Sequence, residues 1–457
     1  MNELILVTLY TMLIWGATYY YSKGYTNTKK EFLVANREIG TFSGALSVAA
    51  TWIWAPALFV SATKAYTSGI PGLFWFTVPN VLCLCLFGYF ANRLRELVPD
   101  GFTLSAYIRD TVSPRVQKLY WGEMGYLTIS SFAIQLLAGG LLLNKMTGVD
   151  FWLITVVMAG IALSYSLFSG IKGSVVTDCV QMIIIGAVCL VLVPWAIIQG
   201  GGWETVAKGA TGSIFDLDVF LTFGIAVSIG LLAGPFGDQM FYQRAFSIRK
   251  EKIKNAFLWG AGIFAIVPIS MGILGFLGTG LGLQVPAGLV NYEVIKELLP
   301  VWAVYPFLFA VMCGLLSTCD SAMCAISSIA VNDWFPKTVR PIYVARIAMG
   351  CLAVLAITIA NTPGMAIVHL FLFHSTFRAC TLLPTIQAVL YRDVHEPTMF
   401  WGIIVSLVFG FPLFCYGMLF GGGWMFIAPG AIITAGASGL ITYYGRKMYA
   451  GRNNITT

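Results

Sequence analysis

The sequence has few charged residues. Asp, Glu, Lys and Arg make up 10% of its 457 residues, whereas a typical soluble domain has about 25%. So low a charged fraction cannot cover a water-facing surface of ordinary composition, which argues against a soluble enzyme and against a disordered chain. Because 58% of the residues are hydrophobic and the mean hydropathy is +0.81, the composition indicates a polytopic membrane protein.

The sequence also lacks the motifs of several function classes. It has no P-loop, so ATP is not the expected energy source. It has no paired-carboxylate or Ser-His-Asp pattern, so we expect neither an enzyme nor a bound cofactor. The ten cysteines lie in or beside apolar stretches without paired Cys/His spacing, which is typical of reduced core residues. The net charge of +7 is interpreted as a topology signal rather than as evidence for nucleic-acid binding.

Long apolar stretches are what the sequence has in abundance. A transmembrane helix needs about 20 mostly apolar residues. About thirteen stretches qualify: 3–21, 42–66, 72–92, 120–144, 150–168, 176–198, 217–239, 255–279, 300–328, 343–361, 364–389, 399–419 and 424–444. We therefore expect an all-α polytopic protein with one transmembrane domain over 1–457, embedded in a lipid bilayer.

The basic residues predict the orientation of these helices. Of the 27 Lys and Arg residues, the loops expected on one side hold only Lys145, Lys208 and Lys296, and Lys64 and Arg378 fall inside expected helices. All the others lie in loops of the opposite side, which the positive-inside rule makes cytoplasmic. The N-terminus is then outside and the C-terminus inside. The first stretch lacks a positive leader and a small-residue cleavage site, so it is expected to be a retained helix.

Two of the expected helices carry helix-breaking residues in corresponding positions. The second contains Pro56, and the seventh contains Gly230, Gly234, Pro235 and Gly237. The start of the seventh helix follows the start of the second by five helices, which is the spacing of two five-helix repeats with opposite orientation. Gly and Pro are common in membrane helices in general, but paired breaks favour a transporter with a site at the breaks, since free backbone groups at membrane depth are tolerated only around a cavity or an ion.

The ninth expected helix has a face of small oxygen-bearing residues. Gly314, Ser317, Thr318 and Ser321 follow the i, i+3, i+4, i+7 spacing, and Asp320 lies on the flank of that face. Hydroxyl and carbonyl oxygens are ligands for hard cations. The alternative is that the hydroxyls bond to carbonyls of their own helix and pack against a neighbour.

The remaining membrane-embedded polar residues each have two interpretations. Asp178 is a functional carboxylate, or it caps a helix or pairs with Lys172. Asp238 and Gln239 follow the break in the seventh helix, where Asp238 either serves the site or pairs with Arg244. Arg378 binds a ligand or extends to the membrane surface, and His374, on the same face, is interpreted as a packing residue. Trp52 and Trp54 beside the break either line a small-solute pocket or belong to the core.

The chain resembles the sodium:solute symporter family over nearly its full length. The residues that carry the resemblance are Phe32-Leu33-Val34-Ala35-Asn36-Arg37, Gly170-Ile171-Lys172 with Thr177-Asp178-x-x-Gln181, Gln243-Arg244, and Ser317-Thr318-x-Asp320-Ser321. It is most similar to the urea active transporter branch. That similarity is carried by Trp52-x-Trp54-Ala55, Trp75, Asp238-Gln239-x-x-Tyr242-Gln243-Arg244-Ala245, and Thr376-Phe377-Arg378 with Leu383-Pro384-Thr385.

The resemblance implies a LeuT-type fold of two inverted repeats, at 42–198 and 217–389, with an extra helix at 3–21 and two more at 399–444. It implies a sodium site made by the carbonyls of Ala50, Ile53 and Gly314 and the hydroxyls of Ser317 and Thr318. A second sodium site would involve Asp178, Ser321 and Asp320. The residues expected to bind the solute are Trp52, Trp54, Trp75, Asp238, Gln239 and Arg378.

The function expected on these grounds is secondary active symport. Sodium is the coupling ion, and urea or a related small amide is the favoured solute. Sodium-coupled uptake of proline or another amino acid is the alternative, as is an uncoupled or proton-coupled channel or facilitator. A membrane sensor is not favoured, because the sequence ends at Thr457, soon after the last expected helix.

Overall fold

The computed structural model describes residues 2–22, 28–364 and 367–453. Lys23, one of the basic residues expected in a cytoplasmic loop, and residues 365–366 of the expected helix 364–389 lie outside these ranges. Within them the protein is helical, and its only β-type pairing is a single bridge between Ile39 and Ile248.

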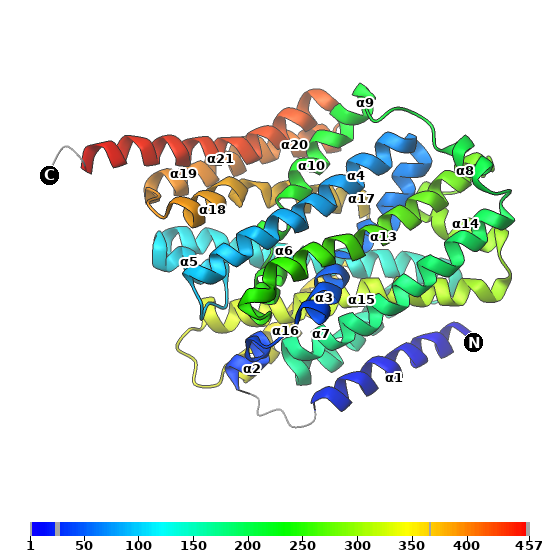
Figure 1. Cartoon of the computed structure of the whole chain (residues 1–457), viewed down its shortest axis with the longest axis horizontal. Helices are drawn as coiled ribbons and strands as arrows, with labels where there is room; N and C mark the ends of the chain where they lie inside the picture. Colours follow the sequence, from blue (N-terminus) through cyan, green and yellow to red (C-terminus); the bar gives the residue numbers. More distant parts are fainter. Residues whose placement is uncertain (1, 23–27, 365–366, 454–457) are drawn as a thin grey trace.

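The helices are named in chain order (Figure 1). They are α1 (Asn2–Ser22), α2 (Lys29–Val34), α3 (Thr41–Trp52), α4 (Ala55–Leu97), α5 (Leu104–Thr111), α6 (Pro114–Thr147), α7 (Phe151–Gln199), α8 (Trp203–Gly209), α9 (Leu217–Val219), α10 (Ile225–Leu232), α11 (Gly234–Gly237), α12 (Gln239–Ser247), α13 (Ile253–Gly280), α14 (Val290–Leu298), α15 (Val304–Ile329), α16 (Pro341–Ala360), α17 (Ile367–Phe377), α18 (Ala379–Tyr391), α19 (Glu396–Val405), α20 (Phe411–Leu419) and α21 (Trp424–Asn453).

Much of this helical structure is apolar enough to cross a membrane. Nine helical stretches of the described residues meet the length and hydropathy required, and the shorter apolar stretch Leu217–Leu232 accompanies them. The nine are Ala55–Leu97, Pro114–Thr147, Phe151–Gln199, Lys250–Gly280, Val301–Trp334, Pro341–Ala360, Ile367–Tyr391, Glu396–Leu419 and Trp424–Tyr449. The all-α, multi-pass character expected from the sequence is confirmed.

Two of the long helices change direction at a glycine. In α4 the change is at Gly69 (φ 64°), and in α7 it is at Gly170 (φ 54°). A Cβ atom would lie 2.1 Å from the Thr211 carbonyl oxygen at the first position and 2.3 Å from the Phe32 carbonyl oxygen at the second. Only glycine combines this backbone conformation with such close approach. Each of these helices therefore covers two of the stretches that the sequence separates.

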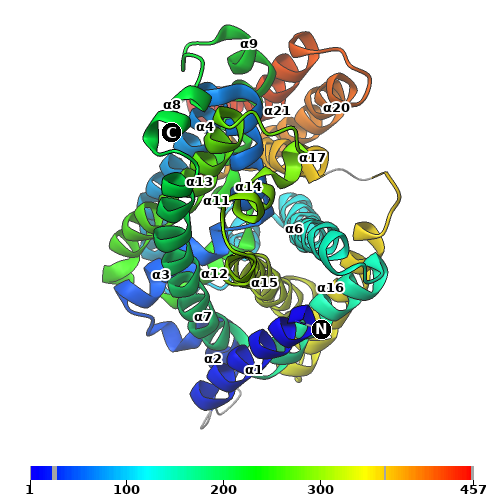
Figure 2. The same cartoon turned by 90° about the vertical axis from the view of Figure 1, so that its right-hand side faces the viewer.

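Helix α15 lies in the interior of the bundle. Viewed from one end, α15 and the short α12 lie near the middle, with α1 and the pair α20 and α21 at the periphery (Figure 2). Every residue from 310 to 330 is buried. A membrane helix with no lipid-facing side can carry polar residues on its whole circumference, and this position places the hydroxyl-rich face of α15 in the protein core.

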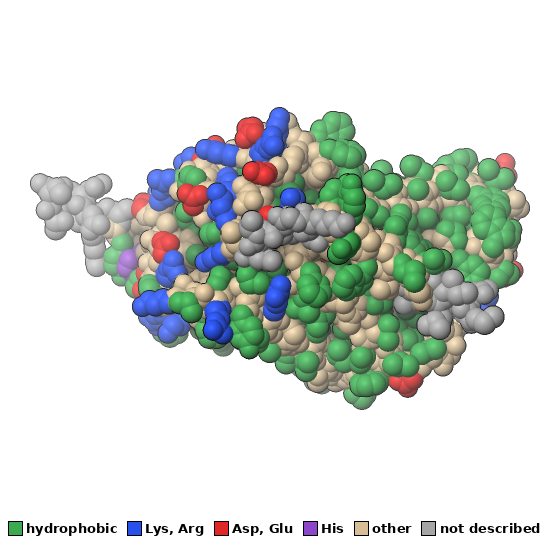
Figure 3. All heavy atoms as spheres, turned by 90° about the horizontal axis from the view of Figure 1, so that it is seen from below, with side chains coloured by type: hydrophobic (Ala, Val, Ile, Leu, Met, Phe, Trp, Pro, Cys, Tyr) green, Lys and Arg blue, Asp and Glu red, His purple; other side chains and the backbone are tan. Residues whose placement is uncertain are grey.

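The face of the molecule seen from below divides into two parts along the long axis (Figure 3). Lys and Arg side chains gather at the end where α21 finishes, and hydrophobic side chains cover most of the rest (Figure 3). Helix α1 begins at the opposite end from the one where α21 ends (Figure 1). Large exposed apolar residues such as Trp152, Phe168 and Ile198 fit a belt that contacts lipid rather than water.

Candidate functional site

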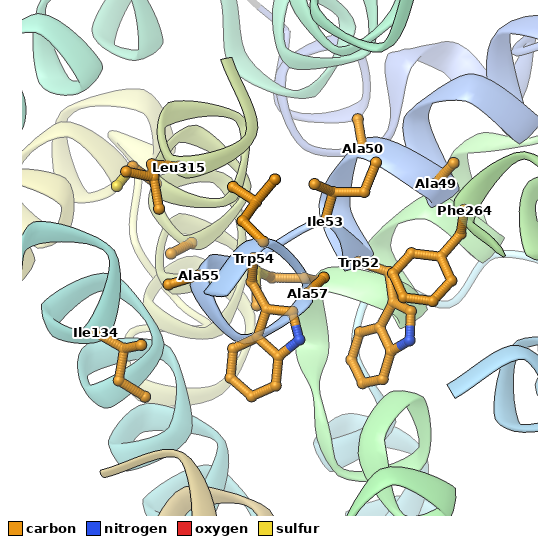
Figure 4. Close-up of a cluster of buried hydrophobic side chains, with 14 of the residues drawn as sticks. Ala49, Ala50, Trp52, Ile53, Trp54, Ala55, Ala57, Ile134, Phe264 and Leu315 are labelled. Carbon is orange, nitrogen blue, oxygen red and sulfur yellow. The ribbon is translucent and has the colours of Figure 1, made fainter. Parts of the chain in front are cut away.

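The first break lies between α3 and α4. Ile53 (φ −83°, ψ 79°) and Trp54 (φ −102°, ψ 175°) leave the helical conformation. Pro56, which the sequence indicated as the breaking residue, lies in the first turn of α4, where its missing N–H costs nothing. The free N–H of Ala55 donates to Oε1 of Gln135 on α6 at 2.7 Å. Figure 4 shows Ile53 between the two helices, with Trp52 and Trp54 beside it.

Five oxygen atoms meet where this break faces α15. Ser317 Oγ lies 3.0 Å from the carbonyl oxygens of Ala50 and Gly314. Thr318 Oγ1 lies 3.3 Å from the carbonyl oxygens of Ile53 and Gly314. These are the five residues named as sodium ligands from the sequence, and the structure brings all of them together. A Cβ atom at Gly314 would lie 3.0 Å from the side chain of Leu58 and 3.1 Å from that of Ile53, so a larger residue there would push both side chains away.

The chemistry of this oxygen cluster suits a small monovalent cation. Two hydroxyl hydrogens are shared among three carbonyl oxygens, so the carbonyl oxygens keep unused capacity to accept hydrogen bonds. A cation at the centre would accept lone pairs from all five atoms, with the hydroxyl hydrogens turned outward. All ligands are neutral, and neutral oxygen atoms bind a monovalent ion more readily than they could compensate a divalent one.

A small closed cavity adjoins the oxygen cluster. Thr318 belongs to both, and all the residues around the cavity are buried. They are Thr51, Trp52, Trp54, Ser131, Asp238, Met240, Thr318, His374 and Arg378. The cavity thus unites the first break, the second break between α11 and α12, and the junction between α17 and α18. Of the residues predicted to bind solute, Trp52, Trp54, Asp238 and Arg378 line it.

The cavity wall is rich in unsatisfied hydrogen-bond donors. Nη2 of Arg378 and the indole N–H groups of Trp52 and Trp54 are buried without a partner among the described residues. The guanidinium group of Arg378 lies 5.3 Å and 5.7 Å from the two indole rings, and its Nε donates to the Gly230 carbonyl at 2.9 Å. Asp238 accepts from the N–H of Met240 at 2.9 Å and so caps α12. Buried donors without partners are costly, so this wall is suited to a ligand with acceptor oxygens.

A second buried polar group surrounds Arg244, close to the oxygen cluster. Arg244 Nη2 lies 2.9 Å from Asp178 Oδ2 and 2.6 Å from Ser321 Oγ. Its Nε donates to Ser47 at 3.0 Å and its Nη1 to the Met240 carbonyl at 3.2 Å. The partner of Asp178 is therefore Arg244, which leaves Asp238 without the pairing to Arg244 that the sequence allowed.

Asp320 belongs to the same group but not to the ion pair. Its Oδ1 accepts from Ser174 at 2.7 Å, and its Oδ2 accepts from Thr177 at 3.0 Å and Tyr165 at 3.1 Å. The residues named for a second sodium site, Asp178, Ser321 and Asp320, are therefore neighbours, with the guanidinium of Arg244 among them. Binding of a second sodium ion by these residues stays a prediction.

Two residues predicted to bind solute lie apart from the cavity. The indole N–H of Trp75 donates to the Ile214 carbonyl at 3.2 Å, and its ring packs on Phe220. The amide of Gln239 donates to the Phe102 carbonyl at 2.8 Å and to the hydroxyl of Ser328 on α15 at 3.3 Å. Gln239 directly follows the second break, whereas Trp75 lies far along α4 from the first, and neither side chain lines the cavity.

Sequence reasoning missed several residues of the site. Gln135 caps the broken helix, Ser131 lines the cavity, and Glu123 is a buried carboxylate on the same helix α6. All three fall inside the expected helix 120–144, so a search for polar residues within apolar stretches would have found them. His374 is hydrogen-bonded to Ser130 at 2.7 Å, as a packing residue should be, yet it also lines the cavity.

Comparisons with known proteins point to one family. The model of the sodium:solute symporter family matches residues 32–406. The chain is 25% identical over 351 residues to the probable urea active transporter 1 of Schizosaccharomyces pombe, an alignment that covers 69% of this chain and 52% of that protein. It is also 25% identical over 399 residues to the sodium/proline symporter of Staphylococcus aureus, covering 80% of this chain and 76% of that protein. The chain thus spans about half the length of the first of these relatives.

A solved structure shares the fold. The substrate-bound outward-open state of a Na+-coupled sialic acid symporter matches with a TM-score of 0.81 over 98% of both chains, at 16% sequence identity. Identity at this level establishes the common architecture alone.

Proposed function

The chain belongs to the sodium:solute symporter family, and from that premise we propose that it takes up a small polar solute together with sodium by alternating access. The observation that carries the proposal is the contact between the five-oxygen cluster and the donor-lined cavity through Thr318. An ion in the oxygen cluster and a solute in the cavity would be adjacent. Binding of each would then favour binding of the other, as coupling requires.

The proposed topology has about thirteen membrane passes, with the N-terminus outside and the C-terminus inside. It is supported by the position of α1 and α21 at opposite ends and by the Lys and Arg side chains at the end where α21 finishes (Figures 1 and 3). The two broken helices are taken as the first helices of inverted repeats at 42–198 and 217–389. A sodium gradient is maintained across the plasma membrane, so we place the protein there, as a monomer.

Sodium would bind first, at Ala50, Ile53, Gly314, Ser317 and Thr318. These ligands come from both sides of the first break and from α15, so the ion would hold α3 and α4 against α15. The solute would then bind in the cavity, and the repeats would move to open the opposite side. Inward movement of one positive charge gains about 2.3 kcal/mol per 100 mV of membrane potential.

Urea or a related small amide is the proposed solute. Its carbonyl oxygen would accept from the free donors of Arg378, Trp52 and Trp54, and its N–H groups would donate to Asp238. The cavity has room for about one water molecule in this structure, so the surrounding side chains must move apart when the solute enters. The relative in Schizosaccharomyces pombe, whose name includes urea transport, agrees with this choice.

A zwitterionic amino acid such as proline is the second candidate. Arg378 and Asp238 carry opposite charges at one cavity, and neither has an ion-pair partner within the described part of the chain. The carboxylate of an amino acid would pair with Arg378 and its ammonium or imino group with Asp238. The sodium/proline symporter relative supports this alternative.

Reconstituted liposomes would decide between these functions. The purified protein is tested for accumulation of [14C]urea and of [3H]proline under an inward sodium gradient, an inward proton gradient, or neither. Sodium-dependent accumulation above the outside concentration is the expected result. Equilibration without accumulation would indicate a facilitator, and accumulation driven by protons alone would overturn sodium coupling.

Replacing both Ser317 and Thr318 with alanine tests the ion site directly. Each substitution removes one hydroxyl ligand while the three carbonyls stay. Sodium-dependent accumulation should be lost, and the concentration of sodium needed for half-maximal uptake should rise at least tenfold if residual uptake is measurable. Undiminished uptake would refute the assignment of the oxygen cluster.

A further inference from the structure

Glu123 is a buried carboxylate to which the proposed transport cycle so far gives no part. Its side chain is 5% exposed. Oε1 accepts from the hydroxyl of Thr381 at 2.9 Å, whereas Oε2 has no hydrogen-bond partner in the described ranges. No Lys or Arg of the described chain lies within ion-pair distance of it. A buried carboxylate in the membrane without a cation is costly and is usually functional.

Glu123 and Arg378 border the same point in the structure. A Cβ atom built on Gly237 would lie 3.0 Å from Cβ of Arg378 and 3.6 Å from Oε1 of Glu123. Oε1 of Glu123 therefore lies at most about 7 Å from Cβ of Arg378. The guanidinium group at the end of the arginine side chain can reach across that distance. Because residue 237 is glycine, no side chain fills the space between them.

The backbone at Arg378 is already interrupted. Arg378 lies between α17 and α18, and its N–H is 3.5 Å from the carbonyl of His374, long for a helical hydrogen bond. The Thr381 hydroxyl that bonds to Glu123 also lies 3.4 Å from the Arg378 carbonyl oxygen. A residue at such a junction can change its side-chain direction with little loss of helix structure.

Glu123 lies toward one exit from the cavity. It precedes the cavity residue Ser131 by two helical turns on α6, about 12 Å along the axis. That direction leads to the start of α6, at the Lys- and Arg-rich end of the molecule (Figures 1 and 3). In the proposed topology this is the cytoplasmic end, where the solute leaves.

We propose that Glu123 is a positioning residue that withdraws the Arg378 guanidinium from the solute during release to the cytoplasm. In this structure the guanidinium faces the cavity and the two indole rings. Once the inner side opens, it pairs with Glu123, and the solute loses its charged donor. This inference rests on the proposed symport function, because it assigns the guanidinium a role in holding the solute.

The variant Glu123→Gln tests the proposal, since the amide keeps the shape and removes the competing charge. The solute should then be held more tightly and released more slowly. We expect turnover and KM to fall together, by about three- to tenfold, in liposome uptake of [14C]urea or [3H]proline, whichever the wild-type protein accumulates. Glu123→Asp keeps the charge and should restore most of the turnover.

Two controls separate this role from a purely structural one. Asp333→Asn makes the same chemical change at another carboxylate of the inner half, where Thr103 donates at 3.1 Å, and should leave KM unchanged. In an Arg378→Lys background, the effect of Glu123→Gln on KM should be smaller, because the ammonium group keeps the charge but cannot make the two parallel hydrogen bonds by which a guanidinium pairs with a carboxylate.

Each outcome is informative. A fall in turnover with an unchanged or higher KM, or wild-type values for both, would overturn the role of Glu123 while leaving the symport function intact. If the wild-type protein accumulates neither solute under a sodium gradient, both the function and this inference fail. Should Glu123→Gln not fold, as judged by size-exclusion chromatography, Glu123→Asp in the wild-type and in the Arg378→Lys background still measures the dependence on the carboxylate position.

Discussion

The two fully buried arginines of the membrane region differ in how their charge is compensated. Arg244 and Arg378 are each 1% exposed. Arg244 pairs with Asp178 and donates to side chains of α3, α7 and α15. Arg378 makes one hydrogen bond to a carbonyl through Nε, leaves Nη2 free, and has no carboxylate at ion-pair distance in the described residues.

The difference indicates two distinct uses of a costly side chain. A charge with all its partners in place stabilises one arrangement of the helices around it. A charge that lacks a partner raises the free energy of the protein, and a ligand that supplies acceptor oxygens removes that cost. Arg244 is therefore interpreted as a structural junction and Arg378 as a binding group.

The largest expected effect is on stability, from Arg244→Ala. Removing one partner of a buried pair leaves Asp178 uncompensated, which costs about 3–5 kcal/mol. The thermal unfolding midpoint of the purified protein should fall strongly. An unchanged midpoint would remove the distinction drawn between the two arginines.

The next effect is on transport, from Arg378→Ala. We expect uptake to fall by about 100-fold, the loss of one charge-assisted hydrogen bond of up to ~3 kcal/mol. The unfolding midpoint should stay the same or rise, since an unpaired buried charge is removed. A destabilised but transport-competent variant would show that Arg378 behaves like Arg244.

A smaller effect is expected from Asp178→Asn. The amide keeps the hydrogen bond from Ser47 but loses the charge opposite Arg244, so stability should fall by about 1–3 kcal/mol. Sodium dependence measured at saturating solute identifies the role of the carboxylate. An unchanged dependence is expected if Arg244 alone balances Asp178, whereas a loss of sodium dependence would favour a second ion at this group.

The smallest effect is expected from Trp52→Phe, which removes one neutral donor from the cavity. KM should rise about two- to tenfold, corresponding to 0.5–1.5 kcal/mol. Trp75→Phe is the matched control, because Trp75 contacts Phe220 and the Ile214 carbonyl instead of the cavity. Equal effects of the two substitutions would contradict the boundary of the site.

The sequence predicted those parts of the site that depend on local spacing. The hydroxyl face of α15 follows from the positions of Ser317 and Thr318, and both broken helices were expected from Gly and Pro. The break itself occurs at Ile53 and Trp54 rather than at Pro56, because proline is well accommodated in the first turn of a helix.

Contacts between distant helices could not be predicted in this way. Nothing in the spacing of Asp178 and Arg244 indicates that they pair, since the partner depends on how α7 and α12 pack. For the same reason Trp75 and Gln239 were placed at the site when their side chains point elsewhere. The count of membrane helices was also obscured in the structure, where α4 and α7 each join two expected stretches at a glycine.

The bridge between Ile39 and Ile248 has a consequence for the motion of the broken helices. Ile39 precedes α3 and Ile248 follows α12, and the bonds Ile39 N–H to Ser247 O (3.2 Å) and Arg249 N–H to Ile39 O (3.0 Å) tie the two segments together. The bridge therefore links α3 and α12, one half of each broken helix, at their ends. If α3 and α12 move together, the amides of Ile39 and Arg249 stay protected from hydrogen exchange throughout transport. If the two helices separate, those two amides exchange each time the inner side opens.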